Sequence, residues 1–80
     1  SDIYNVQQIR QRILERYRSD PKIRINVSIA WPKLHLNNVP VEITGVYVHI
    51  FQIEENSSGL AKRHTLQYTD MLTHNIEIFY

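Results

Sequence analysis

The stretch from residue 66 to residue 79, LQYTDMLTHNIEIF, holds the side chains of this sequence that are best suited to catalysis. Asp70 and His74 offer an acid and a base, and Thr69 or Thr73 offers a hydroxyl nucleophile, which together are the parts of a small hydrolase. Such groups act only when nucleophile and base lie at hydrogen-bond distance in a pocket and a further group orients the base. The sequence shows no such further group, so we predict no catalytic residues and a protein that is not an enzyme.

The same residues have the composition of a short turn between two strands. About six residues separate the two apolar runs, which is enough for one helical turn. Thr69 or Asp70 can satisfy free backbone amides at the start of such a turn, and Leu72 can close the end of the apolar core. We therefore interpret Thr69, Asp70, Leu72 and Thr73 as a structural turn.

Metal and phosphate chemistry find little support in the sequence. The histidines are His35, His49, His64 and His74, none of them four residues from another, and there is no cysteine. A zinc site on a helix needs closer spacing, and a phosphate-binding loop needs more than the two glycines, Gly45 and Gly59. We predict no metal ion and no cofactor.

The charged residues are unevenly distributed along the chain. Residues 1–33 hold seven of the nine Lys and Arg residues against three acids, a net charge of +4, whereas residues 34–80 carry a net charge of −3. On a helix and the strand after it, five of these basic residues form one candidate binding patch: Arg12, Arg16, Arg18, Lys22 and Arg24. Arg12 and Arg16 share one flank of the helix, and Arg18 lies on the other. Such a patch suits contact with nucleic acid, but it also suits a protein-facing or solvated surface, and both interpretations stay open.

The elements that must position these residues begin with a helix. Val6, Ile9, Ile13 and Tyr17 recur at steps of three and four, which is the spacing of an amphipathic helix. Asn5 followed by Gln8 resembles a capping box, and the proline of SDP ends the helix. We predict a helix at about residues 5–18.

Strands follow the helix. Residues 22–29 alternate strictly between apolar and polar, which predicts a half-buried strand. Pro32 interrupts it, KLHL is a short strand and NNVP is a turn signal. We predict a long strand from residue 41 to residue 54, bent at Gly45, and Trp31 as the lid of the core.

The long strand is apolar on both faces, because Val46, Val48 and Ile50 face away from Ile43 and Phe51. Such a strand needs two covers. One cover is the helix; the alternative is a second copy of the chain. We predict a homodimer with Val46, Val48 or Ile50 at the contact if the helix packs elsewhere.

Two more strands, at residues 60–68 and 75–79, complete the chain. Five short strands with tight connections indicate a small barrel, and residues 1–80 form one domain. The lack of cysteine, of a signal-peptide pattern and of a membrane-length apolar run predicts a cytoplasmic location without membrane contact.

Three segments carry a resemblance to a known family. YTDMLTHNIEI resembles the C-terminal signature of the Veg family, small bacterial proteins described as stimulators of biofilm formation, GVYVHIFQIEE resembles its central strand, and VQQIRQRILERY its opening helix. The resemblance implies an α+β, mainly β fold: an N-terminal helix at about 5–18 followed by a small five-stranded SH3-like barrel at about 22–80. SDPK and AWPKLHLNN stand where members carry a glycine and a basic, glycine-rich stretch, and Val48 and His49 replace a proline and a serine.

Two functions from different classes follow. The resemblance implies a non-enzymatic regulatory or adaptor protein that acts through protein contacts, with partners that the sequence does not name. The basic patch indicates the alternative, a small barrel that associates with nucleic acid. A salt titration distinguishes them, because phosphate contacts give a steep dependence on salt.

Overall fold

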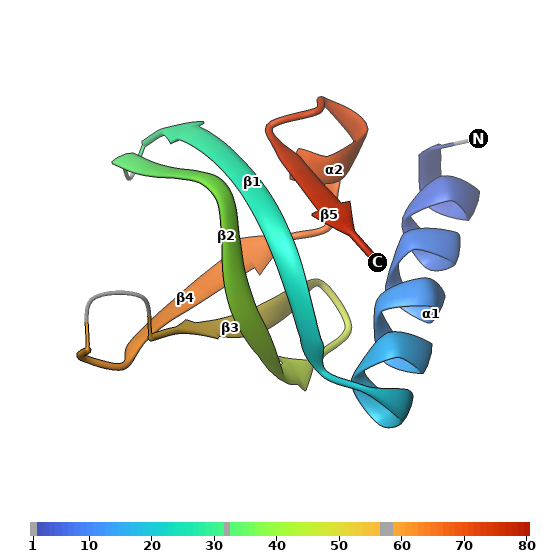
Figure 1. Cartoon of the computed structure of the whole chain (residues 1–80). Coiled ribbons are helices and arrows are strands. Elements are labelled where there is room, and N and C mark those ends of the chain that lie inside the picture. Colours follow the sequence, from blue (N-terminus) through green and yellow to red (C-terminus); the bar gives the residue numbers. More distant parts are fainter. Residues whose placement is uncertain (1, 32, 57–58) are drawn as a thin grey trace.

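A long helix stands beside a curled antiparallel sheet in the computed structural model, which describes residues 2–31, 33–56 and 59–80 (Figure 1). The elements are α1 (Asp2–Ser19), β1 (Lys22–Ala30), β2 (Lys33–Val46), β3 (Ile50–Glu55), β4 (Lys62–Gln67), α2 (Thr69–Leu72) and β5 (Ile76–Phe79). The predicted α+β, mainly β class is confirmed. No helix among the described residues is both long and apolar enough to cross a membrane.

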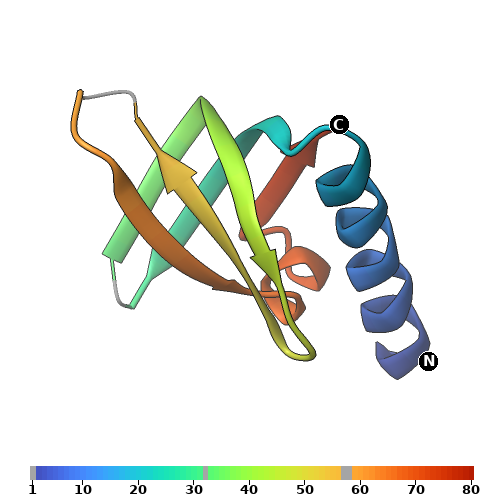
Figure 2. The same ribbon diagram turned by 90° about the horizontal axis from the view of Figure 1, so that it is seen from below.

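The five strands form a single sheet in the order β4-β3-β2-β1-β5, with every neighbouring pair antiparallel. In Figure 1, β3 and β4 pass behind β1 and β2, and Figure 2 shows the same crossing from below. The first and last strands of this order do not pair, so the sheet curls without closing. The predicted five strands are therefore present, but they form an open, curled sheet and not a closed barrel. β4 and β5 are the two edges of this sheet.

The helix α1 begins three residues earlier than the sequence predicts. It starts at Asp2, so Asn5 lies within the helix and is not its cap. Three of the four residues of the predicted apolar stripe face the core: Ile13 is fully buried, and Val6 and Ile9 pack against the core. The fourth, Tyr17, is 37% exposed. At the other end the amide of Asp20 donates to the carbonyl of Arg16 (2.8 Å), and the proline after Asp20 ends the helix.

The first hairpin agrees with the sequence in β1 and differs from it in β2. β1 alternates as predicted, burying Ile23, Ile25 and Val27. β2 continues through NNVP, where a turn was predicted, because Asn38 adopts a φ of 51° and a register shift opposite Ile25 and Val27 absorbs the extra residue. Pro32 lies outside the described residues.

Trp31 is not the lid of the core. The indole is 91% exposed, because Trp31 lies in the connection between β1 and β2, at the end of the hairpin. A large aromatic side chain in so small a protein is usually buried. The geometry of the hairpin overrides that preference.

The predicted long strand at 41–54 is two strands. β2 ends at Val46, the chain turns, and β3 starts at Ile50, with the amide of Tyr47 donating to the carbonyl of Ile50 (2.9 Å). We call residues 46–50 the β2–β3 reversal. The predicted irregularity at Gly45 is confirmed, because the register shifts between Ile43 and Gly45.

Two aromatic residues form the centre of the core. Phe51 and Tyr68 are fully buried, and their rings stack with centroids 5.5 Å apart. The hydroxyl of Tyr68 donates to the carbonyl of Tyr47 (2.5 Å), which ties the end of β4 to the β2–β3 reversal. Burial raises the pKa of Tyr68, and the nearby charge of Arg10 offsets part of that rise.

Candidate functional site

The residues that resemble a hydrolase site form a helical turn with a defined stop. At the C-terminal end of α2, the amide of Asn75 donates to the carbonyl of Asp70 (2.9 Å), and the amide of His74 donates to the carbonyl of Met71 (3.4 Å). His74 itself has a φ of 62°. These two bonds and the left-handed residue define a Schellman motif, the common way to end a helix. The segment 69–75, called here the α2 turn, therefore contains the single helical turn that the sequence predicts.

Two details of that prediction are wrong. Neither Thr69 nor Asp70 caps the helix, because Tyr68 occupies the N-cap position and no side chain bonds the free amides. Met71, not Leu72, packs against the core. Among the described residues no hydrogen bond joins the carboxylate of Asp70 to His74. The hydroxyl of Thr73 instead donates to the backbone carbonyl of Asp70 (3.3 Å).

The histidines are dispersed over the molecule. His64 lies 3.1 Å from the carboxylate of Glu55, and both side chains are half-buried on adjacent strands. His35, His49 and His74 are exposed at three separate places. Within the described ranges, no three His, Asp or Glu side chains come close enough to hold a metal ion.

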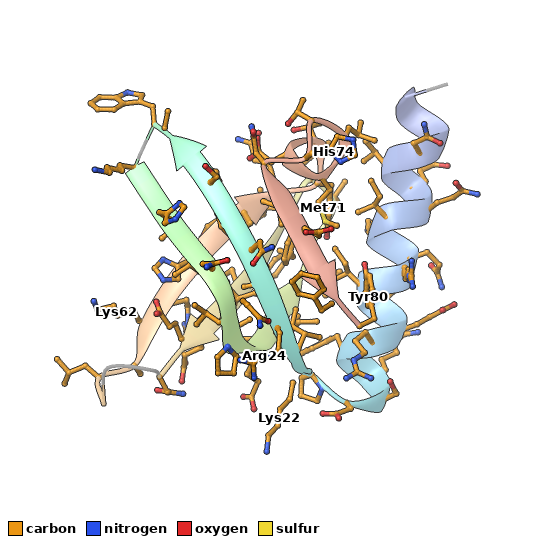
Figure 3. All side chains as sticks on the ribbon, turned by 45° about the horizontal axis from the view of Figure 1, so that its top comes forward. Lys22, Arg24, Lys62, Met71, His74 and Tyr80 are labelled. Carbon is orange, nitrogen blue, oxygen red and sulfur yellow. The ribbon has the colours of Figure 1, made fainter. Side chains whose placement is uncertain are left out.

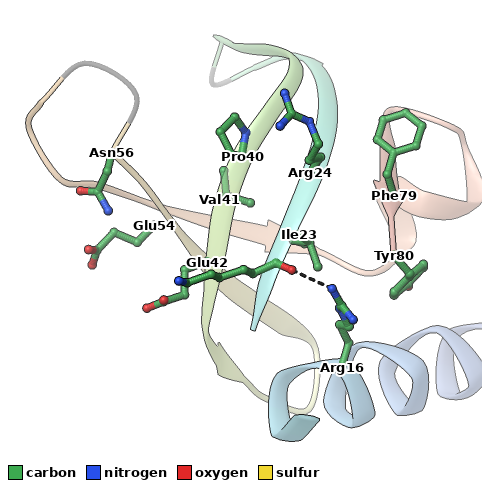
Figure 4. Close-up of a pocket in the computed structure, with 11 residues that line it drawn as sticks. Arg16, Ile23, Arg24, Pro40, Val41, Glu42, Glu54, Asn56, Phe79 and Tyr80 are labelled. Atoms are coloured by element: carbon green, nitrogen blue, oxygen red, sulfur yellow. Dashed lines mark hydrogen bonds between the residues drawn. The ribbon is translucent and has the colours of Figure 1, made fainter. Parts of the chain in front are cut away.

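Three of the five predicted basic residues meet in one groove. Arg16, Lys22 and Arg24 line an open groove of about 600 Å³ between the end of α1, β1 and the end of β5 (Figure 4). Ile23, Pro40 and Val41 form part of its apolar floor. We call this the basic groove.

The two arginines of the basic groove are held in place by the protein. The guanidinium of Arg16 donates to the backbone carbonyl of Lys22 (2.9 Å) and lies 3.8 Å from the carboxylate of Asp20. The guanidinium of Arg24 donates twice to Asn38, to the side-chain oxygen and to the backbone carbonyl (both 2.9 Å). Fixed side chains lose less entropy when a ligand binds.

Two aromatic side chains adjoin these cations, and the sequence analysis missed them. Phe79 pairs with Arg24 across β1 and β5, and the next residue, Tyr80, lies beside it in the groove. Phe79 is 43% exposed and Tyr80 37% exposed. The alternation of β5 offers a partial signal, because buried Ile76 and Ile78 place Phe79 on the outer face.

The remaining two basic residues have different surroundings. The guanidinium of Arg12 lies over the ring of Tyr80, 4.0 Å from its centroid, which is a cation–π contact. Burial raises the pKa of Tyr80, and the positive charge of Arg12 offsets part of the rise. Arg18 is exposed near the end of α1 and lies outside the basic groove. The structure therefore joins four of the five predicted residues into one surface and leaves Arg18 apart.

Acidic side chains also line the basic groove, and one of them, Glu42, is the direct cross-strand partner of Lys22. Glu42 on β2 and Glu54 on β3 line the groove together with the amide side chain of Asn56 (Figure 4). Glu54 also pairs with Arg63 of β4 at 3.6 Å. The groove thus presents guanidinium and ammonium groups, carboxylates and exposed aromatic rings.

The residues predicted for an oligomer contact do not share a strand face. Val46 ends β2 and packs against the core, Ile50 begins β3 and is half-buried, and Val48 lies between them in the β2–β3 reversal, 65% exposed. The strand with two apolar faces, on which the dimer argument rested, is absent. The homodimer itself stays a prediction.

Comparison of the chain with protein-family models, with curated proteins and with solved structures finds no significant match.

Proposed function

We propose that this protein is a non-enzymatic regulatory or adaptor module that acts through contacts with another protein, as its resemblance to the Veg family implies. The observation that supports this most is the mixed charge of the basic groove, which Arg16, Lys22 and Arg24 line together with two carboxylates, those of Glu42 and Glu54. A polypeptide carrying charges of both signs complements such a groove. Exposed aromatic rings beside arginine are also enriched where proteins bind proteins.

The two carboxylates that line the groove weigh against a polyanion as the main ligand. A nucleic acid strand in the groove would bring its phosphates close to Glu42 and Glu54, and like charges brought together cost binding energy. Two of the three arginines of this surface, Arg16 and Arg24, already donate hydrogen bonds to the backbone, so they offer fewer free donors to phosphate.

Site-specific photocrosslinking tests the proposal. A benzoylphenylalanine at position 79 should crosslink one discrete protein in cells, and the same group at Trp31, which is exposed far from the groove, is the matched control. Charge reversal by Lys22→Glu should abolish the crosslink, whereas Lys33→Glu, at another exposed lysine that lies outside the groove, should preserve it. A crosslink that persists in folded Lys22→Glu protein, or that forms equally from position 31, would contradict a role for the groove.

A specific contact supports the second candidate function, association with nucleic acid. Arg12 stacked on Tyr80, with Phe79 and Arg24 beside it, combines cations with ring faces, which single-stranded nucleic acids use as stacking platforms. Binding to labelled single-stranded DNA and RNA should then weaken as the salt concentration rises. The logarithm of the binding constant should fall with the logarithm of the salt concentration, with a slope of about −0.7 for each phosphate contact. Undetectable binding of the unmodified protein at low salt would remove this candidate.

The proposed function includes a cellular location and an oligomeric state. We propose a cytoplasmic protein, since the chain contains no cysteine, and a homodimer whose contact includes exposed Val48. Light scattering over a concentration series decides the second point, because a strictly monomeric mass at the highest concentration excludes the dimer.

A further inference from the structure

The outer edge of β5 and the helix α1 enclose a second groove, of about 560 Å³, called here the edge groove. Gln8, Ile9 and Arg12 line its helical wall, and Ile76 and Ile78 line the strand wall. Both ribbon views place α1 alongside β5, on the side away from β1 (Figures 1 and 2). Figure 3 shows His74 near one end of this space and Tyr80 near the other.

The backbone of β5 turns unused hydrogen-bonding groups toward the edge groove. The amide of Ser28 donates to the carbonyl of Asn75 (2.7 Å), which sets the alternation of the antiparallel ladder between β1 and β5. Glu77 and Phe79 therefore bond to β1, and the amides and carbonyls of Ile76 and Ile78 point outward. Among the described residues, no hydrogen bond reaches these four outward groups.

The helix does not simply shield this edge. Natural proteins often cover an edge strand with a helix, but a helix that only covers leaves no room beside the strand. Here the space between β5 and α1 has the size of a ligand pocket, for which about 300 to 1,000 Å³ is usual. An added strand needs about 4.8 Å from its neighbour, so the edge groove offers a strand on one wall and a helix on the other.

We propose that the edge groove binds an extended segment of a partner protein, which adds to the sheet as a sixth strand beside β5. Strand addition of this kind takes its affinity from main-chain hydrogen bonds and its specificity from alternate side chains. Side chains that point inward meet Ile9, Ile76 and Ile78, and so must be apolar. The side chain opposite Glu77 points outward.

Charge complementarity defines that outward side chain. Glu77 is exposed and accepts a hydrogen bond from Asn26 (3.2 Å), and no cation pairs with it among the described residues. Opposite charges directly across two strands stabilise the pairing. The partner segment is therefore apolar–basic–apolar, with the basic residue opposite Glu77.

A second copy of the chain does not fit this site as a folded domain. Its own β5 is flanked by its own α1, so pairing the two edges would bring two helices into one groove. Arg16, Lys22 and Arg24 do not line the edge groove, so this inference stands or fails separately from the proposed function.

The test uses the full chain labelled with ¹⁵N and the synthetic peptide acetyl-Ser-Thr-Val-Lys-Val-Thr-Ser-amide. In the free protein the amides of Ile76 and Ile78 should exchange with solvent faster than those of Glu77 and Phe79. The peptide should slow exchange at Ile76 and Ile78, and shift resonances on β5 and along Gln8, Ile9 and Arg12. Shifts confined to the basic groove, or no binding at about 5 mM peptide, which is weaker than about −3 kcal/mol, would overturn the proposal.

Matched control peptides and a protein variant distinguish strand addition from non-specific binding. The same peptide with N-methylated valines cannot donate main-chain hydrogen bonds to the edge and should not bind. A peptide with Glu in place of Lys should bind about 3- to 10-fold more weakly, and Glu77→Lys protein should reverse that preference. Binding that is indifferent to N-methylation or to the charge swap would contradict the model. A dimeric mass in light scattering, together with slow exchange at the amides of Ile76 and Ile78 without peptide, would show that a second copy occupies the edge.

Discussion

The β2–β3 reversal and the α2 turn both redirect the chain within a few residues, yet their sequences encode them very differently. The α2 turn contains polar residues with local bonding partners, and its stop is a Schellman motif complete within residues 70–75. The reversal, VYVHI, contains no glycine, proline, asparagine or aspartate. Among the described non-glycine residues only Asn38 and His74 have a positive φ, so the reversal also lacks the backbone geometry that favours tight hairpins.

Contacts from elsewhere in the chain support the reversal instead. Tyr68, twenty-one residues along the chain, donates its hydroxyl hydrogen bond to the carbonyl of Tyr47. The ring of Tyr47 in turn lies over Gly45, where an added Cβ would come within 2.7 Å of it. Tyr68 is also the N-cap residue of α2. A single buried tyrosine thus connects a locally encoded turn with one that depends on tertiary structure.

Removing Tyr68 should have the largest effect. Tyr68→Ala deletes a fully buried ring stacked on Phe51 and should lower the free energy of unfolding by about 3–5 kcal/mol. Tyr68→Phe keeps the ring and removes only the hydrogen bond to Tyr47, and should cost about 0.5–1.5 kcal/mol. Urea unfolding measures both. Equal losses in the two variants would contradict the separate contributions of packing and hydrogen bond.

This difference between the two turns explains which features the sequence could predict. The strand at 22–29 and the helical turn at 69–72 were predictable, because periodicity and polar residues act over a few positions. The break at 46–50 was not, because it depends on Tyr68. The bulge at Asn38 likewise depends on its partner strand, where Asn26 accepts a hydrogen bond from the amide of Asn38 (2.6 Å).

The candidate site shows the same limit. Arg16, Lys22 and Arg24 were predictable as one patch, because they fall on a helix and on the wet face of the next strand. Their aromatic neighbours were not, since Tyr80 reaches Arg12 from the other end of the chain. Periodicity describes the faces of single elements, whereas the meeting of α1 with β5 is a property of the sheet order.

Filling the space above Gly45 should disturb the reversal and spare the α2 turn. Gly45→Val places methyl groups where the end of the Tyr47 ring lies, so that ring must move aside. Tyr47 is half exposed, so its ring can swing outward and weaken the bond from its amide to Ile50. Amide exchange should therefore accelerate at Tyr47 and stay unchanged at Asn75. Equal acceleration at both amides would mean that the two turns open together.

Alkaline pH should weaken the connection between the two turns. The folded-state pKa of Tyr68 is raised, mainly by burial, so the folded protein retains a proton that the unfolded chain loses near its ordinary pKa of about 10. Above that pH the unfolded state binds fewer protons, and stability falls as pH rises. The raised pKa of Tyr80 acts in the same direction. Urea midpoints from about pH 8 to about pH 11 should fall less steeply in Tyr68→Phe than in the unmodified protein, and an unchanged slope would assign the effect to Tyr80 or another group.

The smallest effect should come from the α2 turn itself, and its sign should be opposite. His74 holds a φ of 62°, a conformation that costs a side-chain-bearing residue about 1 kcal/mol and glycine almost nothing. His74→Gly should therefore raise the free energy of unfolding, by less than about 1 kcal/mol, because glycine also gains entropy in the unfolded chain. Asp70→Ala is the matched control: its side chain makes no cap bond, so stability should change by less than about 0.5 kcal/mol. A loss on the scale of a helix cap, about 1 kcal/mol, in Asp70→Ala would show that Asp70 does cap α2. A destabilised His74→Gly would show that the imidazole contributes more than its backbone conformation costs.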